Sequence, residues 1–331
     1  MSTTRSRPTT ITRWLIGFIS LGIAGWLWLN HQYVIDLIHY NQYTPSAAVE
    51  SVASKARLTG DGKFLFYASE PEIAGRSTFN ARCERKEANS PILGCYSLGR
   101  IYIFNVTSDQ LDGIQAVTAA HEMLHAAYDR LSQSEKDRLK PLLEAAYQRV
   151  KTTELETRMA YYNKNEPGQG VNELHSILGT EFTNLGGELE RYYERYFTNR
   201  ASLVALHSSV QSVFTSLSNK ADSLLKQANA LADTINTATK KYNLAVAQLN
   251  EDVAAFNARA QRSGGFNDQA ELDSARSALI ARSDVLDATR QQIKADITTY
   301  DSLVAQLKIV SAETISLNKS IDSTLSETPA L

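Results

Sequence analysis

The chain has 331 residues, 43% of them hydrophobic, which suits about two domains of roughly 150 residues with a folded core. Its 34 basic and 36 acidic residues give a formal net charge of −2, and no long run of one sign occurs. This balance excludes the basic surface that binds a nucleic-acid backbone, so we expect no nucleic-acid partner.

An uncharged and almost wholly apolar segment covers residues 14–29, WLIGFISLGIAGWLWL. Arg5, Arg7 and Arg13 precede it, and no lysine or arginine follows before Lys55. Under the positive-inside rule this asymmetry predicts a single-pass anchor in the cell membrane, with a cytoplasmic N-terminus and an extracytoplasmic remainder. The lipid bilayer is then one partner. A cleaved signal peptide is the alternative, but no small-residue cleavage site follows the apolar run.

The two cysteines, Cys83 and Cys95, belong to the part of the chain that this topology places outside the cytoplasm, where disulfides persist. We therefore expect them to be bridged. The polar residues between them indicate a connection between two extended segments. Two unpaired buried thiols are the alternative, whereas a metal site is disfavoured because the spacing lacks a close C-x-x-C pair.

Two segments rich in aromatic and β-branched residues follow the strand pattern, GKFLFYAS at 62–69 and GRIYIFNV at 99–106. The second leads through a short loop into a helix that carries the motif HEMLH. His121 and His125 are four residues apart, so both imidazoles project from one face of that helix and can bind one Zn²⁺ ion. Glu122 lies beside them as a candidate general base for the metal-bound water. The alternative is two histidines satisfied inside a packed helix.

The motif and the strands before it resemble the zincin metallopeptidases over about residues 60–200. The resemblance implies an α+β domain in which a small antiparallel sheet lies over the active-site helix. It also implies that segment 99–106 is the edge strand, which pairs with the backbone of a peptide or protein substrate. Zn²⁺ is the implied cofactor.

A catalytic zinc site normally takes three protein ligands, so a further ligand is expected downstream of His125. No H-x-x-G-x-x-H extension follows the motif, which excludes a third histidine at that spacing. Asn172, Glu173 and Ser176 resemble the NExxS part of the thermolysin-type ligand motif, although Ile177 stands where that motif has aspartate. Glu173 is therefore our predicted third ligand.

Two other residues of the same segment compete with Glu173. Glu181 shares an otherwise apolar helix face, where a buried carboxylate would need a cation, and His175 lies between the two glutamates. The oxyanion of the tetrahedral intermediate has several candidate hydrogen-bond donors, namely His175, Tyr161, Tyr162, Tyr192 and Tyr193. The tyrosines around 192 are also consistent with simple aromatic packing.

Heptad spacing dominates the chain from about residue 200. The paired glycines in RSGGFND, residues 262–268, interrupt it. The apolar positions on either side are Leu217, Ala221, Leu224, Ala228, Leu231, Ile235, Ala238, Tyr242, Ala245 and Leu249, then Leu272, Ala275, Leu279, Leu286, Ile293, Tyr300, Leu303, Leu307, Val310, Thr314, Leu317 and Ile321. This pattern predicts an antiparallel coiled-coil hairpin, which serves as a spacer, a partner-binding arm or a self-association element.

These features divide the chain into a cytoplasmic tip and transmembrane anchor at 1–40, a zincin-like domain at 41–200 and a helical hairpin at 201–331. The predicted function is a membrane-anchored, extracytoplasmic zinc metallopeptidase in which Glu122 activates a zinc-bound water. The alternative is a structural or scaffolding envelope protein that acts through its coiled coil and has an inert or purely structural metal site.

Overall fold

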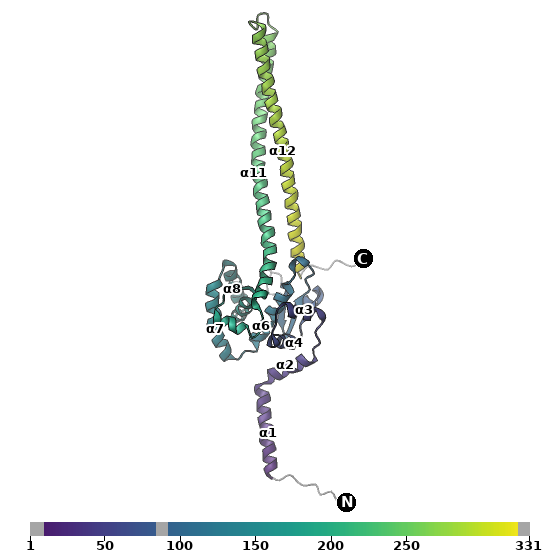
Figure 1. The fold of residues 1–331 in the computed structure, drawn as a ribbon, viewed down its shortest axis with the longest axis vertical. Coiled ribbons are helices and arrows are strands. Elements are labelled where there is room, and N and C mark those ends of the chain that lie inside the picture. Colours follow the sequence, from purple (N-terminus) through teal and green to yellow (C-terminus); the bar gives the residue numbers. More distant parts are fainter. Residues whose placement is uncertain (1–9, 84–91, 324–331) are drawn as a thin grey trace, which may run out of the picture. The chain divides into compact units, whose positions relative to one another are not determined.

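The computed structural model describes residues 10–83 and 92–323, and its elements are labelled in Figure 1. The chain forms two compact units, one of Met1–Val213 with Leu317–Leu331 and the other of Phe214–Ser316. The predicted basic tip at Arg5 and Arg7 lies outside the described residues. Most of the predicted connection between the cysteines, residues 84–91, also lies outside them.

The first unit is mostly helical and contains a small sheet. Its helices are α1 (Thr10–Leu29), α2 (His31–Gln42), α3 (Ala47–Lys55), α4 (Gly60–Ala68), α5 (Arg76–Arg82), the short 3-10 helix η1 (Asp109–Leu111), α6 (Ile114–Asp129), α7 (Gln133–Val150), α8 (Thr153–Asn165), α9 (Gly170–Glu181) and α10 (Gly187–Tyr193). Its strands are β1 (Glu72–Ala74), β2 (Gly94–Ser97) and β3 (Arg100–Phe104). Two long helices follow, α11 (Arg200–Ala260) and α12 (Gln269–Ile321).

The apolar segment expected to anchor the chain forms helix α1, and α2 begins directly after Asn30. Large apolar side chains on α1 are exposed, among them Phe18, Leu21 and Trp28. Among the residues that the structure describes, no helix is long and apolar enough to cross a membrane. The predicted transmembrane helix at 14–29 is therefore not confirmed.

The sheet is mixed, and the prediction of an antiparallel sheet was wrong. Its strand order is β1-β3-β2, with β1 parallel and β2 antiparallel to β3. Segment 99–106 forms the central strand β3 and not the edge strand. The reason is burial on both faces: Ile101 and Ile103 join the main core, while Tyr102 and Phe104 join a second cluster on the opposite face.

Segment 62–69 forms helix α4, so the predicted strand was wrong there. The Thr59 side chain accepts a hydrogen bond from the Gly62 amide at 3.0 Å and caps the helix. Tyr33 and Tyr40 of α2 pack against Phe64, with ring centroids 5.9 and 5.3 Å apart. A short apolar run has no decisive periodicity, and here the cap and the neighbouring helix decide its structure.

The disulfide between Cys83 and Cys95 is present, with 5.8 Å between the two Cα atoms. It joins the end of α5 to β2 and packs in the second cluster with Phe79 and Phe104. The segment before Cys83 is helical, so the prediction of two extended segments holds only on the Cys95 side. The bridge fixes β2 to α5 independently of the residues between the cysteines.

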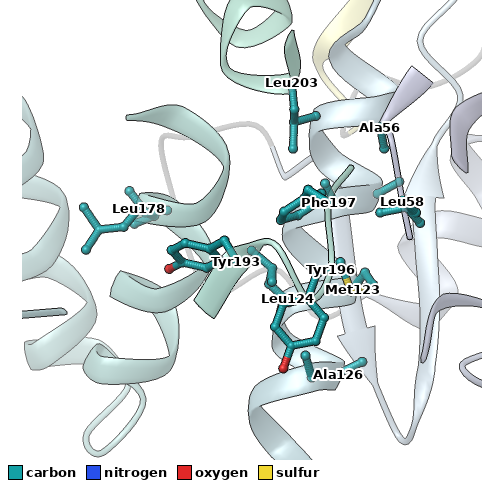
Figure 2. Close-up of a cluster of buried hydrophobic side chains, with 14 of the residues drawn as sticks. Ala56, Leu58, Met123, Leu124, Ala126, Leu178, Tyr193, Tyr196, Phe197 and Leu203 are labelled. Carbon is teal, nitrogen blue, oxygen red and sulfur yellow. The ribbon is translucent and has the colours of Figure 1, made fainter. Parts of the chain in front are cut away.

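Helix α6 runs through the main core and is buried on most of its circumference. Met123, Leu124 and Ala126 are fully buried, and Figure 2 shows them beside Tyr193 and Tyr196 of the aromatic stretch. The tyrosine-rich segment thus packs aromatic side chains against the HEMLH helix. Such enclosure holds the helix rigidly and fixes the direction of its polar side chains.

The second unit contains a long helical hairpin, as the heptads predicted. Helices α11 and α12 run side by side in Figure 1, and Arg282 pairs with Asp252 across them at 2.6 Å. The turn forms at the predicted glycines, where Gly264 has a φ of +72°. One seam position differs, because Val246 is half-buried whereas the expected Ala245 is exposed.

Candidate metal centre

Two histidines converge on helix α6. His121 and His125 lie one turn apart, and their Nε2 atoms approach to 3.1 Å with ring centroids 4.8 Å apart. No proline or glycine interrupts α6, so the four-residue spacing keeps both rings on one face. Their side chains are 19% and 11% exposed, so the pair is sheltered yet still reached by solvent.

Helix α9 brings a carboxylate to this pair. Glu173 Oε2 lies 3.7 Å from His121 Nε2, and Glu173 Oε1 lies 3.6 Å from His125 Nε2. The close packing of α9 on α6 depends on Gly179, where an added Cβ would lie 2.4 Å from a methyl group of Leu124. The ligand atoms of the two histidines and Glu173 all lie within 4.8 Å of one another, so the group could hold a metal ion.

The spacing of these atoms fits one tetrahedral ion. Two nitrogens bound at about 2.0–2.1 Å and at a tetrahedral angle lie about 3.3 Å apart. The observed separations of 3.1 Å between the nitrogens of His121 and His125, and of 3.6 and 3.7 Å to the oxygens of Glu173, bracket that value. Two imidazoles and one carboxylate are also a usual donor set for catalytic zinc.

Asn172 fixes the orientation of one ligand ring. Its Oδ1 atom accepts a hydrogen bond from His125 Nδ1 at 3.0 Å, while its amide nitrogen donates to Gln169 at 3.3 Å. Because Nδ1 of a neutral His125 then carries the proton, its Nε2 presents a lone pair towards His121 and Glu173. The ligand atoms of His121, His125 and Glu173 thus face one another, which is the arrangement that a bound metal stabilises.

We expect Asn172→Ala to lower the affinity for zinc by about 10- to 100-fold, because the His125 ring loses its orienting acceptor. Competition with a chromogenic chelator measures this affinity. Asn165→Ala is the control, since Asn165 is an exposed amide that caps a carbonyl within α8. Equal affinities of the two variants would contradict an orienting role for Asn172.

Burial and the neighbouring charges favour the metal-binding protonation states of His125 and Glu173, whereas the raised pKa of His121 favours its protonated form, which must lose a proton to bind metal. Burial lowers the pKa of His125 to about 4, although the charge of Glu173 opposes the shift. Burial alone would also lower the pKa of His121, but the carboxylates of Glu173 and Glu122 raise it above its usual value. Burial alone would raise the pKa of Glu173, yet the two histidines hold it below its usual range. A neutral imidazole and an ionised carboxylate are the ligand forms.

Glu122 lies beneath strand β2. A Cβ added at Gly94 would lie 2.7 Å from Glu122 Oε1, so the absence of a side chain there lets the strand approach the carboxylate. The backbone N–H of Tyr96 donates to Glu122. Burial raises the pKa of Glu122 to about 7; the charges of His121 and Glu173 act in opposite directions, and the Tyr96 N–H opposes the rise.

The two competing candidates for third ligand lie elsewhere. The Glu181 side chain is 11% exposed, and Arg158 donates to both of its oxygens at 2.7 and 2.8 Å. The cation expected for this carboxylate is therefore an arginine. His175 is fully buried, its Nε2 lies 3.0 Å from the hydroxyl of Tyr192, and burial lowers its pKa to about 3.

The tyrosines considered as oxyanion donors also have structural contacts. The hydroxyl of Tyr193 donates to the carbonyl of His175 at 2.6 Å, and Tyr192 bonds to the His175 ring. Tyr161 and Tyr162 pack edge to face on α8, with ring centroids 5.9 Å apart. The packing interpretation of the segment around 192 is thus the one that its contacts support.

Sequence reasoning missed Gly94 and Tyr96, the residues of β2 that contact Glu122. A glycine directly before a bridged cysteine was the available signal, because glycine in a strand often marks a close backbone approach. The sequence pattern also gave no role to Asn172, although this residue directly precedes Glu173. Comparison of the chain with protein-family models, with curated proteins and with solved structures gives no match.

Proposed function

We propose that this chain is a zinc-dependent peptidase that hydrolyses peptide bonds, with zinc held by His121, His125 and Glu173. The observation that carries the proposal is the convergence of these three side chains next to a buried glutamate, Glu122. Zinc bound there would supply a Lewis acid that polarises the substrate carbonyl and acidifies water.

Glu122 is the proposed general base. The residue is only 6% exposed and its carboxylate is held by the backbone N–H of Tyr96, so the carboxylate occupies one defined position. There it would take a proton from the attacking water and later pass that proton to the leaving amine. The sheltered environment strengthens its electrostatic interactions with the reacting groups.

The proposed substrate is an extended peptide segment that adds to the sheet at β2. Among the described residues this strand pairs with β3 alone, so its other edge presents backbone groups near Glu122. Main-chain hydrogen bonds at such an edge bind an extended peptide with little dependence on sequence. Cleavage of unfolded proteins or of flexible segments follows from this mode of binding.

The proposed location is outside the cytoplasm and at a membrane. The Cys83–Cys95 disulfide supports an oxidising compartment. The exposed apolar side chains of α1, such as Phe18 and Trp28, support contact with a lipid bilayer. Substrates would then be proteins of the cell envelope or secreted proteins.

A scaffolding role is the rival proposal. Exposed apolar side chains on the hairpin, among them Leu244 on α11 and Val285 on α12, favour contact with a further protein or with a second copy of this chain. In that case, the metal group would contribute only to stability. The two proposals differ in what they require of Glu122, which does not belong to the group of metal ligands.

We expect Glu122→Gln to retain about one zinc ion per chain and to lose peptidase activity by about 100- to 10,000-fold, because the amide cannot accept the proton. Metal analysis and cleavage of denatured casein measure the two properties. Glu188→Gln, an exposed site on α10, is the control and should match the unmodified protein. A zinc-loaded protein without peptidase activity, or a fully active Glu122→Gln variant, would reject the proposal.

A further inference from the structure

The guanidinium of Arg130, which directly follows α6, joins four elements. Its Nε and NH2 groups donate to both carboxylate oxygens of Asp36 on α2, each at 2.7 Å. Its NH1 group donates to the Tyr96 hydroxyl on β2 at 3.1 Å and to the Ala126 carbonyl of α6 at 2.8 Å. Its NH2 group also lies 3.5 Å from the Ser69 hydroxyl at the end of α4. Planar, five-donor arginine suits such a junction.

Helix α2 is held against the rest of the first unit by this junction and by the packing of Tyr33 and Tyr40 on Phe64 of α4. Asp36 is only 4% exposed and lies on the inner face of a helix whose outer side chains are exposed. Two weaker contacts accompany the pair, one between His39 and Glu70 at 2.8 Å and one from the Tyr43 hydroxyl to the Pro71 carbonyl at 2.5 Å. A buried, bidentate carboxylate–arginine pair gives fixed geometry as well as attraction.

Tyr96 connects the junction to Glu122. Its hydroxyl is bound by Arg130, and its backbone N–H donates to the Glu122 carboxylate. Both contacts belong to one residue of a short strand, so the hydroxyl bond helps to hold the part of β2 that carries the amide. Gly94, two residues before Tyr96 in the same strand, packs against the Glu122 side chain, so a shift of β2 displaces that carboxylate.

We propose that Asp36, Arg130 and Tyr96 are positioning residues. Through β2, they couple the position of α2 to the position of the Glu122 carboxylate. The inference rests on the proposed function of Glu122 as general base. Within the described residues, no hydrogen bond or ion pair joins these three side chains to His121, His125 or Glu173, so they act on the base and not on the metal. Docking of α2, the helix next to α1, then controls how well the base is aligned.

The first test is Tyr96→Phe, which removes the hydroxyl and leaves the Arg130–Asp36 pair and the backbone intact. We expect zinc content to be unchanged and kcat for casein peptides to fall about tenfold, because a small misplacement of a catalytic group is costly. Hydrogen exchange of residues 93–97, followed by mass spectrometry, should be faster than in the unmodified protein. Exchange reports on β2 without any need for peptidase activity.

The second test is Asp36→Asn, with Glu190→Gln as the matched control. Glu190 of α10 forms another bidentate pair with a buried arginine, Arg200 of α11. We expect Asp36→Asn to lower kcat and to speed exchange in β2 as Tyr96→Phe does, and the double variant to be no worse than the stronger single variant. Glu190→Gln should change neither property at temperatures where the protein is folded.

Unchanged exchange in β2 in both Tyr96→Phe and Asp36→Asn overturns the inference, as does an effect equal to that of Glu190→Gln. Additive losses in the double variant also overturn it, because they show independent action. If the unmodified zinc-loaded protein cleaves no peptide, the proposed function fails while exchange in β2 still decides whether the contacts position that strand.

Discussion

Replacing Glu173 with alanine is expected to lower the zinc affinity by roughly a hundredfold or more, because one of three protein ligands is lost and each ligand contributes about 3 kcal/mol. Glu181→Ala is expected to leave the affinity unchanged, since Arg158 and not the histidine pair holds that carboxylate. The two glutamates lie on the same helix, α9, so the comparison separates loss of a ligand from general damage to the helix.

Zinc binding in both variants can be measured by competition with a chelator of known affinity, with far-ultraviolet circular dichroism as the check on folding. Glu181→Ala should be less stable than the unmodified protein, because it leaves the partly buried Arg158 without its partner. If Glu181→Ala releases zinc and Glu173→Ala retains it, the assignment of the third ligand is reversed.

Replacing Asp36 with alanine is expected to lower the free energy of unfolding by about 3–5 kcal/mol, because it leaves the buried Arg130 guanidinium without a counter-charge. The two side chains are 5% and 11% exposed, so water cannot easily replace the lost carboxylate. This is a large part of the stability of an ordinary domain, typically about 5–15 kcal/mol.

Urea unfolding, followed by tyrosine fluorescence or by circular dichroism, measures this loss. Asp61→Ala is the control, because Asp61 and its partner Arg195 are 66% and 53% exposed and such a pair is worth about 0–1 kcal/mol. Comparable losses in the two variants would show that the Asp36–Arg130 pair has no special role in holding α2.

The paired histidines were predictable because helical spacing is a local property. Once α6 is helical, a separation of four residues places His121 and His125 on one face, whatever the rest of the chain does. The hairpin was predictable for the same reason, since heptads specify a seam along a helix. Prediction of the disulfide required only two cysteines and the expectation of an oxidising compartment. The bridge is present between Cys83 and Cys95.

The sheet was less predictable because its pattern is short and ambiguous. Segment 62–69 has aromatic residues that suit a strand, yet the Thr59 cap and the packing of α2 make it a helix. Segment 99–106 is a strand, but its position in the sheet depends on β1 and β2, which lie on either side of it. Pairing between strands is a non-local choice, which single-segment patterns do not specify.

The sequence by itself determined that two imidazoles and Glu122 occupy one helix, and that carboxylates follow on another. Only the tertiary structure decided which carboxylate faces the histidines. Glu173 and Glu181 both lie on α9, but the packing of α9 on α6 turns the first towards the pair, and Arg158 of α8 binds the second. Periodicity specifies the faces of a helix, whereas the neighbours that dock on each face decide which side chains meet.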